Sequence, residues 1–296
     1  MTPAMWAARR GRREVIDLLE KKKADLELVD GFSYNILHWA CHGGHVAMVK
    51  HIVSKNMVDI NSKGQDGRTP VMCAARAGEK RMFELLVSKG DLPLGVDYDG
   101  NNILLLACFG GNVKIVEYII SHDAPNINCT GESGRTPLMA AAYKGHGHIF
   151  DLLVTKGADL TPVDDAGDNI LHVACLGGDV DVVTRLLEQG KVDINSRGHY
   201  SRTPLMMAAR RGEHDIFRLL VNKEADASPV DDDSNNILHL ACKGGQLEIV
   251  KYILGNMMTD IVDINARNQR NETATMRATN GSEVRNLLVS RGGCTR

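Results

Sequence analysis

Apolar side chains recur along this chain at helical spacing. In residues 149–153 and again in 216–220 they occupy positions i, i+1, i+3 and i+4, which gather on one face of a helix. A second helix is predicted before each such segment, for example between Thr69 and Gly78. Thr69 is a favourable N-cap, Pro70 fits the first helical position, and Gly78 is a typical helix stop. The chain is therefore predicted to form pairs of short helices separated by a glycine.

This pattern returns at a fixed interval. The string Ala-Cys-x-Gly-Gly occurs four times, 67 residues apart, and the pair Thr-Pro occurs four times at the same interval. Because the two series interleave at steps of 33 or 34 residues, one unit is one helix pair, and odd and even units differ in detail. A Gly- and Asp-rich turn links the units, and we interpret it as a β-hairpin projection. The repeated cysteines are Cys41, Cys108, Cys175 and Cys242, and the repeated threonines are Thr2, Thr69, Thr136 and Thr203.

The unit resembles the ankyrin repeat, which has a period of about 33 residues and the signature Thr-Pro-Leu-His-x-Ala. The resemblance covers essentially all of residues 1–296 and implies an all-α solenoid in which each helix pair stacks on its neighbours. We expect a single array of about nine repeats: a truncated first repeat (1–29), seven complete repeats (30–269) and an atypical, more polar capping repeat (270–296). At the signature histidine, odd units carry Met72, Met139 and Met206, whereas even units carry His38, Leu105, His172 and His239.

Composition narrows the classes of function. A net charge of −2 excludes a globally basic nucleic-acid binder, and 4% aromatic residues favour a helical core of aliphatic side chains. No apolar run approaches the ~18 residues of a membrane span, and the N-terminal residues lack the apolar core of a signal peptide, so we expect no membrane insertion. The periodic cysteines stand too far apart for disulfides, which favours a reducing compartment. We therefore expect a cytoplasmic monomer.

The sequence lacks the motifs of common catalytic sites. It has no Gly-x-Ser-x-Gly nucleophile elbow, no Gly-x-x-x-x-Gly-Lys-Ser/Thr loop and no His-Glu-x-x-His motif. His38, Cys41, His42 and His45 resemble a zinc cluster, but the first two recur at the array period, which is typical of packing residues. We therefore expect no enzyme, no cofactor and no metal. Asn195 is similar to asparagines that hydroxylases modify in ankyrin repeats, and capping of its own hairpin is the competing interpretation.

The resemblance also implies where a partner binds. In ankyrin arrays the concave face is made by hairpin tips and by the ends of the first helices. Aligned positions there predict a basic floor with apolar islands, and a rim in which arginine alternates with aspartate. Tyrosine, phenylalanine and arginine are typical anchors of interfaces. The floor contains Arg76, Lys144, Arg210, Arg211 and Lys243 with Phe109, Tyr143 and Leu176, and the rim contains Arg68, Arg135 and Arg202 with Asp30, Asp97, Asp164 and Asp231.

These features favour a non-catalytic protein-interaction scaffold that binds a partner segment along the groove. Because arginine binds carboxylates and phosphates bidentately, we expect that segment to be acidic or phosphorylated. Three alternatives stay open: a nucleic-acid-binding array, the soluble ankyrin section of a larger channel or signalling protein, and a secreted effector. The aspartates of the rim disfavour the first alternative, since tracking of phosphates requires uninterrupted positive charge.

Overall fold

The computed structural model describes residues 1–90, 92, 95–122, 126–255 and 261–295. Within these ranges it contains eighteen α-helices in consecutive pairs, two short 3-10 turns and no strand, which confirms the all-α fold expected from the sequence. None of the helices described is long and apolar enough to span a membrane. The chain divides into two compact units, Met1–Ala141 with His148–Ala158, and Ala142–Gly147 with Asp159–Arg296.

The helices follow the predicted order of short pairs. The first unit contains α1 (Pro3–Arg9), α2 (Arg13–Lys21), α3 (Ile36–His42), α4 (Val46–Ser54), α5 (Pro70–Arg76), α6 (Lys80–Val87), α7 (Ile103–Gly110), α8 (Val113–Ser121) and the 3-10 turn η1 (Glu132–Gly134). Two helices, α9 (Pro137–Tyr143) and α10 (Gly147–Thr155), are divided between the units. The second unit contains α11 (Ile170–Gly177), α12 (Val180–Glu188), η2 (His199–Ser201), α13 (Pro204–Arg211), α14 (His214–Asn222), α15 (Ile237–Lys243), α16 (Leu247–Gly255), α17 (Ala274–Arg277) and α18 (Glu283–Ser290).

First helices begin at the N-caps that the sequence predicts. The Oδ1 atom of Asn35 accepts hydrogen bonds from the backbone N–H groups of Leu37 and His38, at 3.0 and 3.1 Å. In an odd repeat, the Oγ1 atom of Thr203 accepts from the N–H of Met206 at 3.4 Å. These bonds satisfy N–H groups that have no partner inside the helix. Thr69 also occupies the N-cap position of its helix, but its side chain accepts no such bond.

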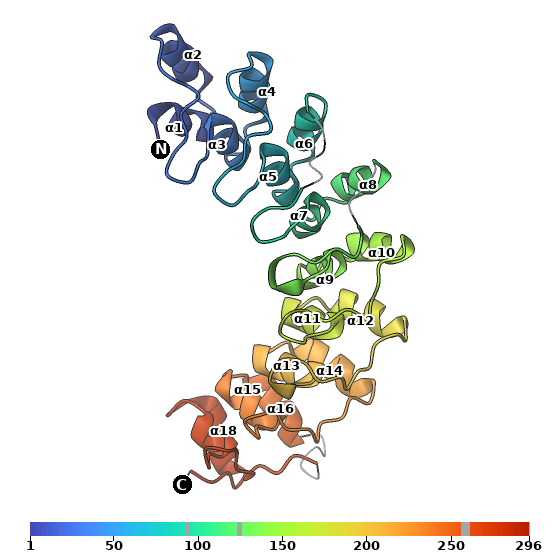
Figure 1. Ribbon diagram of the computed structural model, residues 1–296. Coiled ribbons are helices and arrows are strands. Elements are labelled where there is room, and N and C mark those ends of the chain that lie inside the picture. The colour runs from blue at the N-terminus through green and yellow to red at the C-terminus, as the bar shows by residue number, and fades with distance from the viewer. Residues whose placement is uncertain (91, 93–94, 123–125, 256–260, 296) are drawn as a thin grey trace. The chain divides into compact units, whose positions relative to one another are not determined.

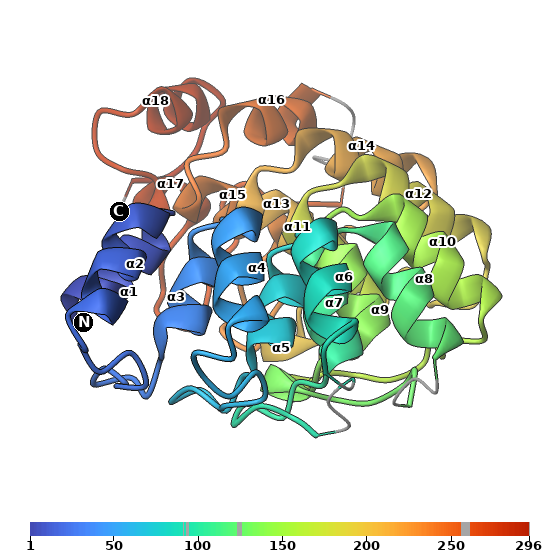
Figure 2. The same cartoon turned by 90° about the horizontal axis from the view of Figure 1, so that it is seen from above.

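Within each unit the helices form two layers. In the first unit, α1, α3, α5 and α7 pack in sequence as one layer, and α4, α6 and α8 pack as the other (Figures 1 and 2). In the second unit, first helices α11, α13, α15 and α17 and second helices α12, α14, α16 and α18 pack in the same way. The side chains of Phe83, Phe150 and Phe217, all on second helices, are fully buried. Since one helix pair cannot cover its own apolar stripe, stacking creates the core.

The loops between repeats are tighter than the hairpins expected from the sequence. In the loop at 64–68, for example, the N–H of Gly64 donates to the carbonyl of Arg68 at 3.0 Å, and the N–H of Gly67 donates to the carbonyl of Gly64 at 2.9 Å. Residues near the loop tip adopt left-handed backbone, as Gly67 does with φ of 75°, and this turns the chain too sharply for a strand ladder. In the residues described, extended pairing is limited to one bridge between Val163 and Asn169.

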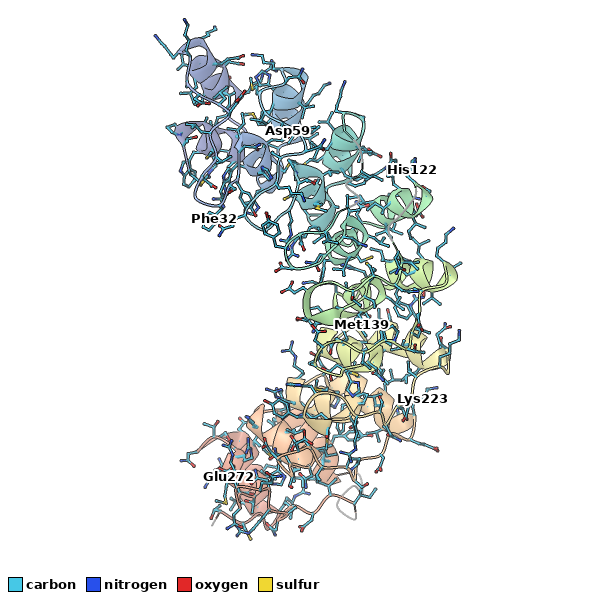
Figure 3. All side chains as sticks on the ribbon, in the orientation of Figure 1. Phe32, Asp59, His122, Met139, Lys223 and Glu272 are labelled. Atoms are coloured by element: carbon cyan, nitrogen blue, oxygen red, sulfur yellow. The ribbon has the colours of Figure 1, made fainter. Side chains whose placement is uncertain are left out.

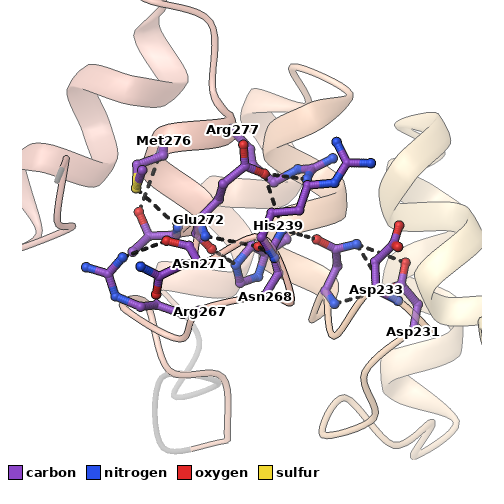
Figure 4. A network of polar contacts seen from close by, with 12 residues as sticks. Asp231, Asp233, His239, Arg267, Asn268, Asn271, Glu272, Met276 and Arg277 are labelled. Atoms are coloured by element: carbon purple, nitrogen blue, oxygen red, sulfur yellow. Dashed lines mark hydrogen bonds and ion pairs between the residues drawn. The ribbon is translucent and has the colours of Figure 1, made fainter.

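Contacts between successive loops give each unit a polar seam. Figure 4 shows this seam between the last two repeats of the second unit. The Nδ2 atom of Asn268 donates to Asn235 Oδ1 at 2.9 Å, and His239 Nε2 lies 3.1 Å from the carbonyl oxygen of Glu272. The Glu272 carboxylate in turn accepts from Arg277 at 2.8 Å. The loops are therefore held to one another by side chains as well as by the helices below them.

Candidate functional site

The ends of three first helices in the second unit enclose a basic pocket of about 440 Å³. Leu176 comes from α11, Arg210 and Arg211 from the last turn of α13, and Lys243 from the last residue of α15. Basic side chains at these positions also interact favourably with the negative ends of the helix dipoles. Four residues predicted for the floor are therefore brought together, and Gly244 and Gln246 complete the pocket lining.

Glycines at the ends of the first helices allow neighbouring repeats to approach one another closely. A Cβ atom at Gly244 would overlap the carbonyl oxygen of Arg210, and a Cβ at Gly177 would overlap the carbonyl of Tyr143. The side chain of Arg211 reaches the carbonyl oxygen of Leu176 at 3.4 Å. The first glycine of each Ala-Cys-x-Gly-Gly string is therefore required for packing, because a side chain there would push the repeats apart.

Positive charge is concentrated around the pocket of the second unit. The pKa of Lys243 is lowered from its ordinary value, first by partial burial and then by repulsion from arginines that include Arg277, Arg210 and Arg202. In the part of the chain that the structure describes, neither Arg210 nor Lys243 forms an ion pair. Because neither Arg210 nor Lys243 has a carboxylate partner among the residues described, a bound anion would stabilise both.

The other floor residues form separate cation–aromatic pairs. In the second unit, Lys144 Nζ lies 5.6 Å from the ring centre of Tyr143. In the first unit, Arg76 Cζ lies 5.7 Å from the ring centre of Phe109. Both cations are exposed and both rings are half-buried. The predicted floor therefore consists of two groups. The second unit contains the basic pocket and the pair of Lys144 and Tyr143, and the first unit contains the pair of Arg76 and Phe109.

Two of the rim arginines pair with rim aspartates of the next loop. Arg202 is buried and donates to Asp231, and Arg68 Nε donates to Asp97 Oδ2 at 2.7 Å. Arg135 occupies the same position in its own loop and is half-buried. Arg68 and Arg202 thus lie in the seam between repeats, where aspartates already neutralise their charges. The sequence contains a sign of this pairing, because each of these arginines stands 29 residues before the aspartate that it contacts in the next loop.

The rim aspartates also bind their own loops, as Asp231 illustrates. Its Oδ1 atom accepts from the backbone N–H groups of Asp233 and Asn235, at 3.1 and 2.8 Å. Three further aspartates accept from the amides two and four residues ahead in the same way. These are Asp30, Asp97 and Asp164.

Sequence reasoning missed a pocket in the first unit. It has a volume of about 300 Å³ and lies between the second and third repeats. The sign of this pocket in the sequence is Tyr34, because the other even repeats have asparagine or aspartate at that position. Figure 3 shows Phe32, two residues before Tyr34, at the opposite edge of this unit from His122. The lining consists of Tyr34, His38, Cys41, His42, Asp66, Arg68, Cys73, Arg76 and Ala77.

Of the histidine and cysteine cluster, His38 and Cys41 are buried, whereas His42 is exposed. His38 is buried, with Nδ1 at 2.8 Å from Asn35 Oδ1 and Nε2 at 3.2 Å from the carbonyl of Arg68. Among the residues described, no three His, Cys, Asp or Glu side chains are grouped so that they could hold a metal ion. Asn195 Oδ1 accepts from the N–H of Asp226 in the next repeat at 2.8 Å. Asn195 thus has a packing role, and its hydroxylation stays a hypothesis.

The stacked helix pairs and their fixed period define a helical solenoid protein built from repeats. Comparison with known families identifies the kind of repeat. The family model described as "Ankyrin repeats (3 copies)" matches residues 4–96, 91–164, 152–231 and 225–295. The chain therefore belongs to the ankyrin-repeat family.

Curated relatives of this chain are much longer proteins. Palmitoyltransferase AKR1 of Lachancea kluyveri is 32% identical over 180 residues, which is 60% of this chain and 24% of the relative. Transient receptor potential cation channel subfamily A member 1 of Homo sapiens is 23% identical over 218 residues, 71% of this chain and 20% of the channel. Alpha-latrocrustotoxin-Lt1a of Latrodectus tredecimguttatus is 27% identical over 227 residues, 76% of this chain and 14% of the toxin. The chain spans a quarter or less of the length of each.

Proposed function

We propose that this chain is a non-catalytic scaffold that holds an anionic segment of a protein partner at the basic pocket of the second unit. Ankyrin repeats are protein-interaction domains, and the pocket supplies a reason for one partner chemistry. Arg210, Arg211 and Lys243 surround the half-buried Leu176. The observation that carries the proposal is the grouping of Arg210, Arg211 and Lys243 around Leu176 in one pocket, where Arg210 is among the arginines that repel Lys243. Carboxylates or a phosphate would relieve the repulsion, and arginine can bind either bidentately.

The test compares two variants with the same change in net charge. In the pocket variant, Arg210→Glu, Arg211→Glu and Lys243→Glu reverse the basic group. In the control variant, Lys191→Glu, Arg218→Glu and Lys223→Glu reverse three exposed cations that do not line the pocket. Circular dichroism and urea unfolding establish that both variants are folded. Proteins are then captured from a nuclease-treated lysate on the wild type and on each variant.

The proposal expects proteins that bind the wild type and the control variant but not the pocket variant. Acidic peptides from those proteins should bind with an affinity that falls as salt rises, and phosphatase treatment identifies any phosphate that contributes. Retention of the same proteins by the pocket variant would contradict the proposal. Material that is captured only when nuclease is omitted would favour the nucleic-acid alternative.

A second candidate is that the chain acts as the ankyrin section of a larger protein, such as a channel or signalling protein. The observation that favours it is the small share of each relative that the chain covers. An antibody against the second unit provides the test by immunoblot of the source cells. A band near 32.3 kDa, the mass of this chain, would argue against this candidate, and a band of several times that mass would support it. We further propose that the chain works as a monomer, and that its setting is reducing and cytoplasmic because all seven cysteines are free.

A further inference from the structure

One even repeat differs from the other three in the side chain that joins its loop to the next loop. In those three, a short polar side chain ties its loop to the next loop. Asn101 Oδ1 accepts from the N–H of Glu132 at 3.0 Å, and Asp168 Oδ1 accepts from the N–H of His199 at 2.7 Å. In the third of these repeats, Asn235 Oδ1 accepts from the side chain of Asn268 in the following loop. The second repeat has tyrosine there, and a phenol ring cannot make this short contact.

Tyr34 instead forms a wall between two repeats. Its ring packs against Gly64, where a Cβ atom would overlap the ring, and it stacks on His38 at 5.1 Å between ring centres. Its hydroxyl donates to Asp66 Oδ2 at 2.8 Å, across the pocket of about 300 Å³. This volume is at the lower end of ligand pockets, so it suits one side chain better than a large ligand.

The polar groups inside the pocket already have partners. Arg68 pairs with Asp97, His38 Nε2 lies 3.2 Å from the Arg68 carbonyl, and the Tyr34 hydroxyl is bonded to Asp66. Burial raises the pKa of Cys73 to about 12, so its thiol is neutral at physiological pH. An occupant therefore meets an aromatic ring, thiols and a methyl group, and a polar group pushed inside would find few free partners.

The mouth of the pocket is positively charged. Arg76 lines it and is exposed, and its guanidinium lies 5.7 Å from the ring of Phe109. Within the described ranges Arg76 forms no ion pair. His42 lines the same pocket and lies 5.6 Å from the ring of Trp39. An apolar interior thus opens beside a cation that has no carboxylate of its own.

We propose that this first-unit pocket binds one apolar side chain of a protein partner, with a carboxylate of the same segment placed at Arg76. The inference rests on the proposed function in that the occupant belongs to a protein, but it concerns a different unit and different residues. It adds a specificity element: an apolar residue next to an acidic one is selected, and either alone binds more weakly.

The two tryptophans of the chain, Trp6 and Trp39, make this testable with small probes. The Trp39 ring packs on Tyr34 and His42, so its indole N–H signal reports on the pocket in NMR spectra of the full chain. The probe is N-acetyl-leucine, which carries an isobutyl side chain next to a carboxylate. N-acetylalanine lacks the apolar group, and N-acetyl-leucine amide lacks the charge. A Trp6→Phe variant assigns the two signals.

The expected result is a saturable shift of the Trp39 signal by millimolar N-acetyl-leucine and at least about tenfold weaker binding of both other probes. Tyr34→Asn, which restores the residue of Asn101 and Asn235, and Arg76→Gln should weaken binding similarly. Ala77→Phe, which fills the pocket from an exposed position, provides a second blocking variant if Tyr34→Asn unfolds. Arg81→Gln, which removes an exposed cation of the same unit that does not line the pocket, is the control that leaves binding unchanged.

Equal shifts with N-acetylalanine, no shift at tens of millimolar, or undiminished binding to Tyr34→Asn or Ala77→Phe would overturn the inference. Its failure is distinguishable from failure of the proposed function. Acidic peptides that still require Arg210 and Lys243 would leave the second-unit site standing when the first-unit pocket takes no probe.

Discussion

Arg202 donates from both Nε and Nη2 to one carboxylate oxygen of Asp231, at 3.1 and 3.0 Å. The two residues are only 5% and 4% exposed, and they belong to successive loops. Removing one partner of a buried ion pair is costly because it leaves an uncompensated charge. The pair therefore makes the second unit depend on the match between neighbouring repeats.

Asp231→Asn should lower the free energy of unfolding by about 3 kcal/mol, since the buried Arg202 loses its counter-charge while the shape is kept. Urea unfolding followed by circular dichroism measures the change. Asp99→Asn is the matched control, because Asp99 is half exposed at 3.3 Å from Arg68, and exposed pairs contribute about 0–1 kcal/mol. Equal losses in the two variants would show that burial of the pair is unimportant.

Stability should fall as the pH is lowered through about 6.5, where unfolded histidine takes up a proton. The pKa values of His38, His172 and His239 are lowered in the folded chain, chiefly because burial disfavours the charged ring. Just below pH 6.5 the unfolded chain therefore binds protons that the folded chain does not, so the free energy of unfolding decreases by up to about 1.4 kcal/mol per pH unit for each histidine.

Urea midpoints at about pH 7.5 and 5.5 test this dependence on pH. His172→Leu copies Leu105, which occupies the same position one even repeat earlier. The variant should show a smaller loss of stability between the two pH values, whatever its stability at the higher one. An unchanged pH dependence would mean that other groups, such as carboxylates, cause the effect.

Gly244→Ala should destabilise the second unit by about 2 kcal/mol, because its new Cβ overlaps the carbonyl oxygen of Arg210 and the repeats must separate. Gly255→Ala is the control, since a Cβ there meets no atom within 4 Å. Thermal unfolding compares the two. A neutral Gly244→Ala variant would indicate that the helix ends can move apart freely, and the pocket would then be adaptable.

One thiol should react rapidly with a thiol reagent at neutral pH, and it should be Cys294, which is exposed. Burial raises the pKa of Cys73 and Cys242 to about 12 and that of Cys129 to about 11, and the thiolate is the reactive form. Absorbance stopped-flow labelling gives the number of fast thiols. Cys294→Ser should abolish the fast phase, and a remaining fast phase would place another cysteine at the surface.

Hydrogen exchange should be fastest in residues 270–295. There α17 has four residues, two of them buried, whereas α13 has eight with six buried. Fewer buried contacts mean a lower free energy of local opening. Exchange measured by mass spectrometry compares this segment with residues 204–254, and equal protection would contradict the expectation.

The sequence alone determined the repeat period, the helix pairs and the caps. These depend on local physics, since a threonine or asparagine satisfies the amides of its own helix and an apolar stripe follows from spacing along one helix. The position of Leu176, Arg210, Arg211 and Lys243 in one pocket followed from the same regularity, because equivalent positions of stacked repeats lie side by side.

Only the tertiary structure decided which charged residues remain available to a partner. Arg202 and Arg210 look alike in the sequence, yet one is buried against Asp231 and the other is exposed, with no ion pair to any residue that the structure describes. The pocket beside Tyr34 likewise depends on what the next loop places opposite that ring. Whether a side chain is paired or exposed depends on contacts between repeats about 30 residues apart, which no pattern within one repeat specifies.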